Sequence, residues 1–192
     1  QKQYRHYKQG SGEEQARSFA FLKYYHVFNC DQIDNLPAHF YPEPPTPQEI
    51  AALQGNAQAF LDGIPVPILE RGEESYYSPL TDTITVPPQD RFHSADARFS
   101  TIAHEAAHST GAKHRLNRQF GKRFGDRAYS AEELVACMAE AKLCAEFGLD
   151  VELHDNHAAY LSHWVGMLRA DKTAIIQAAA KADQAIKWLK DN

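Results

Sequence analysis

His104-Glu105-Ala106-Ala107-His108 places two imidazoles four residues apart, with a carboxylate beside the first. On an α-helix, residues i and i+4 share a face, so both rings can reach one metal ion while Glu105 projects beside the open position of that ion. This spacing is typical of zinc-dependent hydrolases. We therefore predict that His104 and His108 bind Zn²⁺ and that Glu105 acts as the general base.

The residues around this motif favour a helix. Ser94 can cap its N-terminus, Asp96 suits the positive end of the helix dipole, and Gly111 can end it. The alternative is a surface helix with two incidental histidines. An apolar side at helical spacing favours a buried helix instead, and its residues are Phe99, Ile102, Ala103, Ala106 and Ala107.

Length and composition are those of an ordinary globular protein. The chain has 192 residues, of which 43% are hydrophobic and 23% charged, with a net charge of −5. No apolar run has the length of a membrane span, and the N-terminus lacks the apolar core of a signal peptide. The three cysteines show no pairing pattern, so we predict that they are reduced thiols. These features predict a cytoplasmic protein with no membrane partner.

A basic segment follows the histidine-containing helix, although the net charge argues against nucleic-acid binding by the whole surface. It could contact single-stranded DNA or steer an acidic substrate, and a solvated loop is the alternative. Asp126 is the one acidic residue of this segment, and its basic residues are Lys113, Arg115, Arg118, Lys122, Arg123 and Arg127.

The order of predicted elements indicates an α+β fold. A capping box at Thr46 and Glu49 begins a helix that ends at Gly63, and short strands follow at 66–70, 75–78 and 83–86. Prolines 65 and 67 predict that the first strand lies at a sheet edge. A C-terminal helical region follows at 131–147, 156–169 and 172–190. We expect residues 1–18 to be a linker or the remnant of a preceding domain, and residues 19–192 to form the main domain.

A catalytic zinc usually has three protein ligands, so one more is needed. His114 would complete a metzincin pattern, and Glu133 would give the two-histidine, one-glutamate set of thermolysin-like enzymes. Metzincins also need a Met-containing turn, but Met138 and Met167 fall in predicted helices. We favour Glu133, which we place at the margin of the inward side of its helix with Glu132 nearly opposite. The competing interpretation is that Glu133 completes a capping box with Ser130.

We assign substrate binding to two residues near the predicted metal. His114, if it is not a ligand, is a candidate for contacting the substrate or an oxyanion. Tyr129, just before the helix that contains Glu133, could supply a hydroxyl.

Several stretches together resemble the C-terminal zincin-like metallopeptidase domain of ArdC-type antirestriction proteins and TraC-type plasmid primases. The resemblance runs from about residue 19 to the C-terminus. It is carried by Ala20-Phe-Leu-Lys-Tyr-Tyr-His-Val-Phe-Asn29 with Gln32, Tyr76-Tyr-Ser-Pro-x-x-Asp82-x-Ile84, Thr110-Gly111, Arg115-Leu-Asn-Arg118 and Tyr129-x-x-Glu-Glu-Leu-Val-Ala136.

The resemblance implies a zincin-like fold, in which a small sheet has its edge strand beside the His-Glu-x-x-His helix, and a zinc peptidase that cleaves a protein or peptide. It also implies a mobile-element protein whose N-terminal single-stranded-DNA-binding domain is missing here. Glu133 matches the third ligand position. The position four after it is usually acidic but is Cys137 here, so we expect no carboxylate to orient a ligating histidine. The rival function is a non-catalytic, zinc-stabilised module that protects incoming DNA by binding DNA or a restriction enzyme.

Overall fold

The computed structural model describes residues 2–8, 14–20, 25–41, 43, 45–118, 127–151 and 155–192. The chain consists of two compact units, Gln1–Pro44 and Pro45–Asn192. In the first unit, strands β1 (Lys2–Lys8) and β2 (Glu14–Ala20) pair antiparallel. The interpretation of residues 1–18 as a linker or the remnant of a preceding domain, followed by a main domain over 19–192, stays a prediction.

Short 3-10 turns follow in the first unit, at Cys30–Gln32 and Ala38–Phe40. They are tied together by the Tyr41 hydroxyl, which donates a hydrogen bond to the carbonyl oxygen of Cys30.

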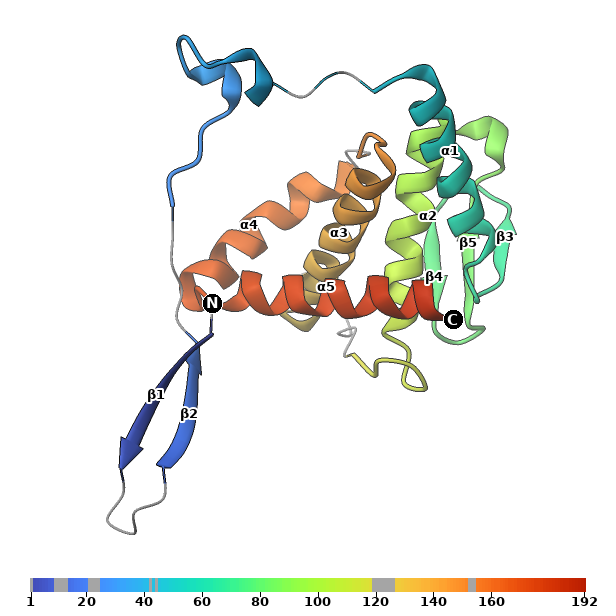
Figure 1. Ribbon diagram of the computed structural model, residues 1–192. Coiled ribbons are helices and arrows are strands. Elements are labelled where there is room, and N and C mark those ends of the chain that lie inside the picture. The colour runs from blue at the N-terminus through green and yellow to red at the C-terminus, as the bar shows by residue number, and fades with distance from the viewer. Residues whose placement is uncertain are drawn as a thin grey trace. The chain divides into compact units, whose positions relative to one another are not determined.

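A three-stranded sheet in the second unit has the order β3-β5-β4 (Figure 1). Strand β3 (Ile68–Glu70) runs parallel to β5 (Thr83–Val86), and β4 (Tyr76–Ser78) runs antiparallel to it. The three strands lie within the predicted segments, and the edge position of β3 confirms the inference from its flanking prolines.

Helices α1 (Pro47–Asp62) and α2 (Ala95–Thr110) begin at their predicted caps. The Thr46 side chain accepts from the Glu49 N–H, and the Glu49 carboxylate accepts from the Thr46 N–H. Helix α2 contains both histidines of the motif and lies between the sheet and α3 (Figure 1). Strand β4, an edge of the sheet, lies beside α2 as predicted.

Helices α3 (Arg127–Phe147), α4 (Asp155–Ala170) and α5 (Ala174–Asp191) form the C-terminal helical region. The α+β arrangement is therefore confirmed. Helix α3 begins before residue 131, so Ser130 lies inside the helix instead of capping it, which excludes the capping box proposed for Glu133. Among the described helices, none is both long and apolar enough to cross a membrane.

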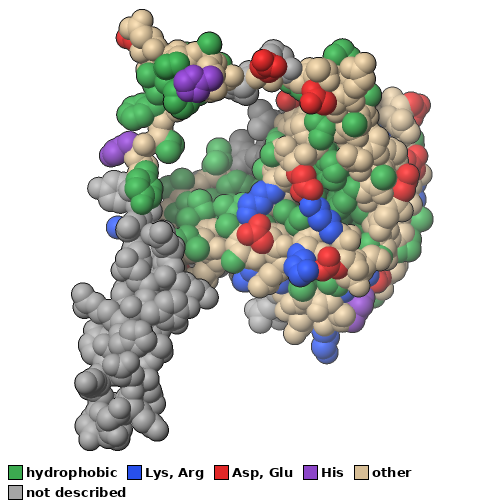
Figure 2. All heavy atoms as spheres, in the orientation of Figure 1, with side chains coloured by type: hydrophobic (Ala, Val, Ile, Leu, Met, Phe, Trp, Pro, Cys, Tyr) green, Lys and Arg blue, Asp and Glu red, His purple; other side chains and the backbone are tan. Residues whose placement is uncertain are grey.

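The core forms where α1, α2, α3 and the sheet meet. Most of the predicted apolar side of α2 is buried there, with Phe99 packing edge-on against Phe147 of α3, and Ala107 is buried in a second cluster with α3 and α5. On the face shown in Figure 2, basic and acidic side chains are interspersed. Pairs such as Lys142 with Asp183 and Lys190 with Glu146 join α3 to α5. These ion pairs are exposed, so each contributes little stability.

Candidate metal centre

Three side chains from α2 and α3 converge on one point. The Nε2 atoms of His104 and His108 lie 3.2 Å apart. The Glu133 carboxylate places one oxygen 3.5 Å from Nε2 of His104 and the other 3.4 Å from Nε2 of His108. All three residues are largely shielded from solvent, so the structure brings together the ligand set favoured from the sequence.

These separations fit a small tetrahedral cation. A zinc ion with bonds of about 2.0–2.1 Å to nitrogen and oxygen holds neighbouring ligand atoms about 3.3–3.4 Å apart. The two Nε2 atoms, 3.2 Å apart, are close to that spacing, and each of them has one Glu133 oxygen at 3.4 or 3.5 Å. The donor set of two imidazoles and one carboxylate also leaves a fourth position for water or substrate.

A carboxylate stands behind each histidine, on the side away from this point. Nδ1 of His104 lies 3.0 Å from Oε2 of Glu140, and Nδ1 of His108 lies 3.3 Å from Oε1 of Glu132. Ring nitrogens held in this way present their Nε2 atoms as metal ligands. The prediction that Cys137 leaves the site without an orienting carboxylate is therefore wrong.

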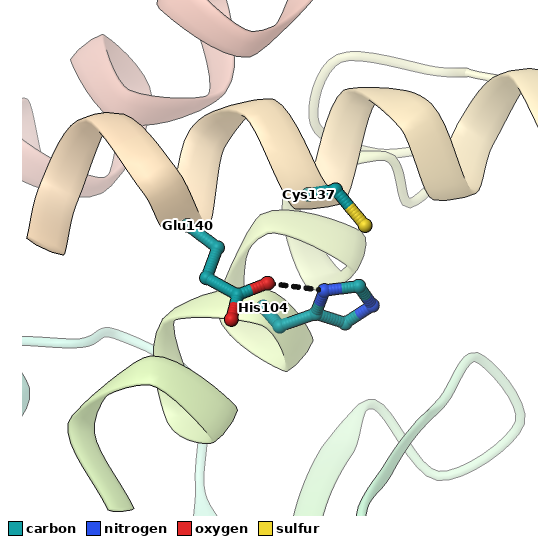
Figure 3. Close-up of side chains that lie close together, drawn as sticks. All are labelled: His104, Cys137 and Glu140. Atoms are coloured by element: carbon teal, nitrogen blue, oxygen red, sulfur yellow. Dashed lines mark hydrogen bonds and ion pairs between the residues drawn. The ribbon is translucent and has the colours of Figure 1, made fainter. Parts of the chain in front are cut away.

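Figure 3 shows two side chains of α3 that face α2: Cys137 and Glu140 both extend toward the ring of His104. Ligand atoms of these three residues lie within 4.8 Å of one another. Glu140 is fully buried and also accepts a hydrogen bond from the Ser100 hydroxyl of α2. A signal for it was present in the sequence, because Glu133, Cys137 and Glu140 recur at helical spacing on one face.

Glu132 corrects a second prediction. It was placed nearly opposite the inward side of its helix, yet its side chain is only 4% exposed. Residues 132–136 are all buried, because α3 is covered on more than one side, so a single apolar face could not separate Glu132 from Glu133. Arg118 supports Glu132 from the loop after α2 by donating from Nε and Nη2 to its carboxylate.

The charges of the site are strongly coupled. Burial opposes protonation of His108, but hydrogen bonds with Glu132 and Glu133 raise its pKa to about 9. Burial likewise works against a charged His104, whose pKa is nevertheless raised by hydrogen bonds with Cys137, Glu133 and Glu140. Burial alone would raise the pKa of Glu133, whereas its contacts with both histidines lower it. The cluster therefore attracts positive charge, as a cation site must.

The catalytic role of Glu105 and the substrate-binding role of Tyr129 stay predictions. Glu105 is buried on α2 beside His104 and is absent from the converging ligand set. Tyr129 is half-buried on α3, one turn before Glu133.

His114 lies outside the described metal cluster. Its side chain is 63% exposed, and its Nε2 atom lies 3.3 Å from the carboxylate of Asp82. The geometry thus favours Glu133 over His114 as the third ligand.

The basic segment after α2 is only partly available to a partner. Both Nη atoms of Arg115 lie 2.7 Å from the Asp82 carboxylate, and its guanidinium also stacks over Trp188. Arg118 is buried against Glu132. These two arginines hold the loop to the fold and are not free for phosphate contacts. Lys113 is exposed, whereas Lys122 and Arg123 lie outside the described residues.

Proteins of known sequence are similar to this chain over most of its length. "Uncharacterized protein y4eC" of Sinorhizobium fredii is 37% identical over 169 residues, covering 88% of this chain and 54% of that protein. "DNA primase TraC" of Escherichia coli is 34% identical over 161 residues, covering 82% of this chain and 11% of the primase. The chain therefore spans about half of the first relative and a small part of the second.

Solved structures give the same relationship. The metal-free crystal structure of antirestriction protein ArdC from plasmid R388 superposes with a TM-score of 0.71 at 36% identity, covering 100% of this chain and 68% of ArdC. Its Mn(II)-bound structure gives a TM-score of 0.66 at 33% identity, with 99% and 67% covered. These matches confirm the resemblance to ArdC-type and TraC-type proteins.

A sequence profile described as "Zincin-like metallopeptidase" (MPTase-PolyVal) matches residues 55–181. That range contains α2 and the converging residues of α3. Since it covers more than half of the chain, the chain belongs to the zincin-like metallopeptidase family.

Proposed function

We propose that this chain is a zinc-dependent peptidase domain in which His104, His108 and Glu133 bind the metal. The observation that carries the proposal is the convergence of two Nε2 atoms and one carboxylate at 3.2–3.5 Å. Zinc suits two imidazoles and one carboxylate, whereas Mg²⁺ and Mn²⁺ prefer sets richer in oxygen. The ArdC structure described as Mn(II)-bound supports a divalent cation in this family.

Glu105 is the general base of the proposed reaction. A zinc ion held by these residues would lower the pKa of a water to ~7 and would polarise the substrate carbonyl. Glu105 would accept the proton of the attacking water and pass it to the leaving amine. Glu132 and Glu140 hold the two imidazoles so that neither ring rotates during the reaction.

The substrate class we propose is an extended peptide or a protein segment. Strand β4 is an edge of the sheet beside α2, and an edge strand offers unpaired backbone groups to an extended chain. Tyr129 and His114 are our candidates for contacting that substrate.

Changing Glu105 to Gln tests the catalytic role. The variant is expected to retain its fold and one zinc per chain while losing about 10²–10⁴-fold in peptide hydrolysis, because only the general base is removed. The assay compares both proteins for self-cleavage and for cleavage of DNA-bound proteins, with and without single-stranded DNA. Equal antirestriction protection by both proteins, with no zinc-dependent proteolysis by either, would replace the peptidase with the rival binding module.

The ligand assignment has its own test. Elemental analysis of Glu133→Ala should show loss of zinc, because only two protein ligands remain, while His114→Ala should keep it. The opposite result would return the third ligand to His114.

A role in mobile-element antirestriction, in the cytoplasm of the host, completes the proposal. It is supported by similarity to the protein named antirestriction ArdC and to the primase named TraC. Single-stranded DNA is the proposed nucleic-acid partner, through the basic segment or a separate N-terminal domain. Because Arg115 and Arg118 are held by carboxylates, Lys113, Lys122 and Arg123 are the remaining candidates in the loop.

A further inference from the structure

We infer that Glu140 is a positioning residue that fixes the ring of His104 as an Nε2 ligand, and that the adjacent Cys137 position can take over this role if it carries a carboxylate. The inference rests on the proposed metal site. It assigns to α3 a contribution to metal affinity besides those of Glu133 and Glu132.

The contacts of Glu140 are specific to one ring. Oε2 lies 3.0 Å from Nδ1 of His104, and Oε1 accepts a hydrogen bond from the Ser100 hydroxyl. Ser100 precedes His104 by one turn of α2, so both carboxylate oxygens are fixed by the helix that carries the ligand. A carboxylate held at both oxygens cannot rotate away, and it therefore holds the imidazole that it contacts.

Burial strengthens this effect. Glu140 is fully buried and His104 is 8% exposed, so water does not compete for the Nδ1 position. A carboxylate at Nδ1 keeps the proton on that nitrogen, leaves the Nε2 lone pair for the metal and raises the basicity of the ligand.

Cys137 lies where a shorter acidic side chain would reach the same ring. Its Sγ lies within 4.8 Å of ligand atoms of both His104 and Glu140, and Figure 3 shows the thiol extending toward the imidazole. Aspartate at position 137 would place carboxylate oxygens close to the position of the sulfur. The same ring could therefore be held from one turn earlier on α3.

The experiment measures zinc affinity of the whole chain by chelator competition. Glu140→Gln is expected to weaken binding by about 10- to 100-fold, the usual effect of removing a group that orients a ligand. Glu146→Gln makes the same change on the exposed side of α3 and should leave affinity unchanged. Thermal unfolding of each metal-free variant shows whether a loss comes from the fold.

The double variants decide between orientation and general packing. Glu140→Gln with Cys137→Asp should recover most of the lost affinity, whereas Glu140→Gln with Cys137→Ser should not. Equal affinity of Glu140→Gln and wild type, or a loss that Cys137→Asp does not repair, would overturn the inference. Absence of zinc binding by wild type would instead overturn the proposed function, so the two failures are distinguishable.

Discussion

Replacing Arg118 with alanine is expected to lower the free energy of unfolding by about 3–5 kcal/mol, the usual cost of removing one partner of a buried ion pair. The side chains of Arg118 and Glu132 are 6% and 4% exposed, so solvent screens the pair weakly. Arg118 also donates to the Thr110 hydroxyl and to the Ala107 carbonyl, each at 2.7 Å. Its removal leaves a buried carboxylate whose remaining described contact is His108.

Urea unfolding of the zinc-loaded protein provides the measurement. A loss of this size corresponds to a fall in Tm of roughly 6–20 °C for a domain of this length. Lys113→Ala is the matched control from the same basic segment, because Lys113 is exposed, and it should change stability by less than about 0.5 kcal/mol. Adding Glu132→Gln to Arg118→Ala should restore part of the loss, since the uncompensated charge is then gone. If Arg118→Ala unfolds like Lys113→Ala, Arg118 is an ordinary surface cation and the phosphate-contact interpretation returns.

Two further predictions concern backbone conformation and pH. Gly148→Ala should cost about 1–2 kcal/mol, because Gly148 has φ +65° and a Cβ there would lie 3.0 Å from Cδ1 of Leu53. Gly166→Ala, inside α4 with no atom within 4 Å of its Cβ, should be neutral or stabilising by up to about 1 kcal/mol, and the reverse order in thermal unfolding would contradict this account. Hydrogen bonds from Arg115 lower the pKa of Asp82 below its ordinary 3.8, so its contribution to stability is present above that pH and is lost as the pH falls below it. Asp82→Asn should therefore lower the Tm of the metal-free protein more near pH 6 than near pH 3, and an equal effect at both values would exclude the ion pair as the cause.

Local rules in the sequence determined the elements and the two proposed histidine ligands. The face shared by two helical residues four apart can be predicted without tertiary information. The caps at Thr46 and Ser94 can be predicted too, because cap hydrogen bonds join residues three apart. The prolines before β3 likewise predicted its edge position, because proline has no backbone N–H to donate to a neighbouring strand.

The surroundings of the ligands depended on tertiary packing. Helical spacing places Glu140 on the same face as Glu133, but the sequence does not show what Glu132 and Glu140 contact, because their partners lie 24 and 36 residues away on α2 and no local pattern encodes that distance. The same packing reassigned Arg115 and Arg118, which look like free cations in the sequence but meet Asp82 and Glu132 in the fold. A charge has the same chemistry wherever it occurs in a chain, whereas burial against an opposite charge is decided only when separate helices come together.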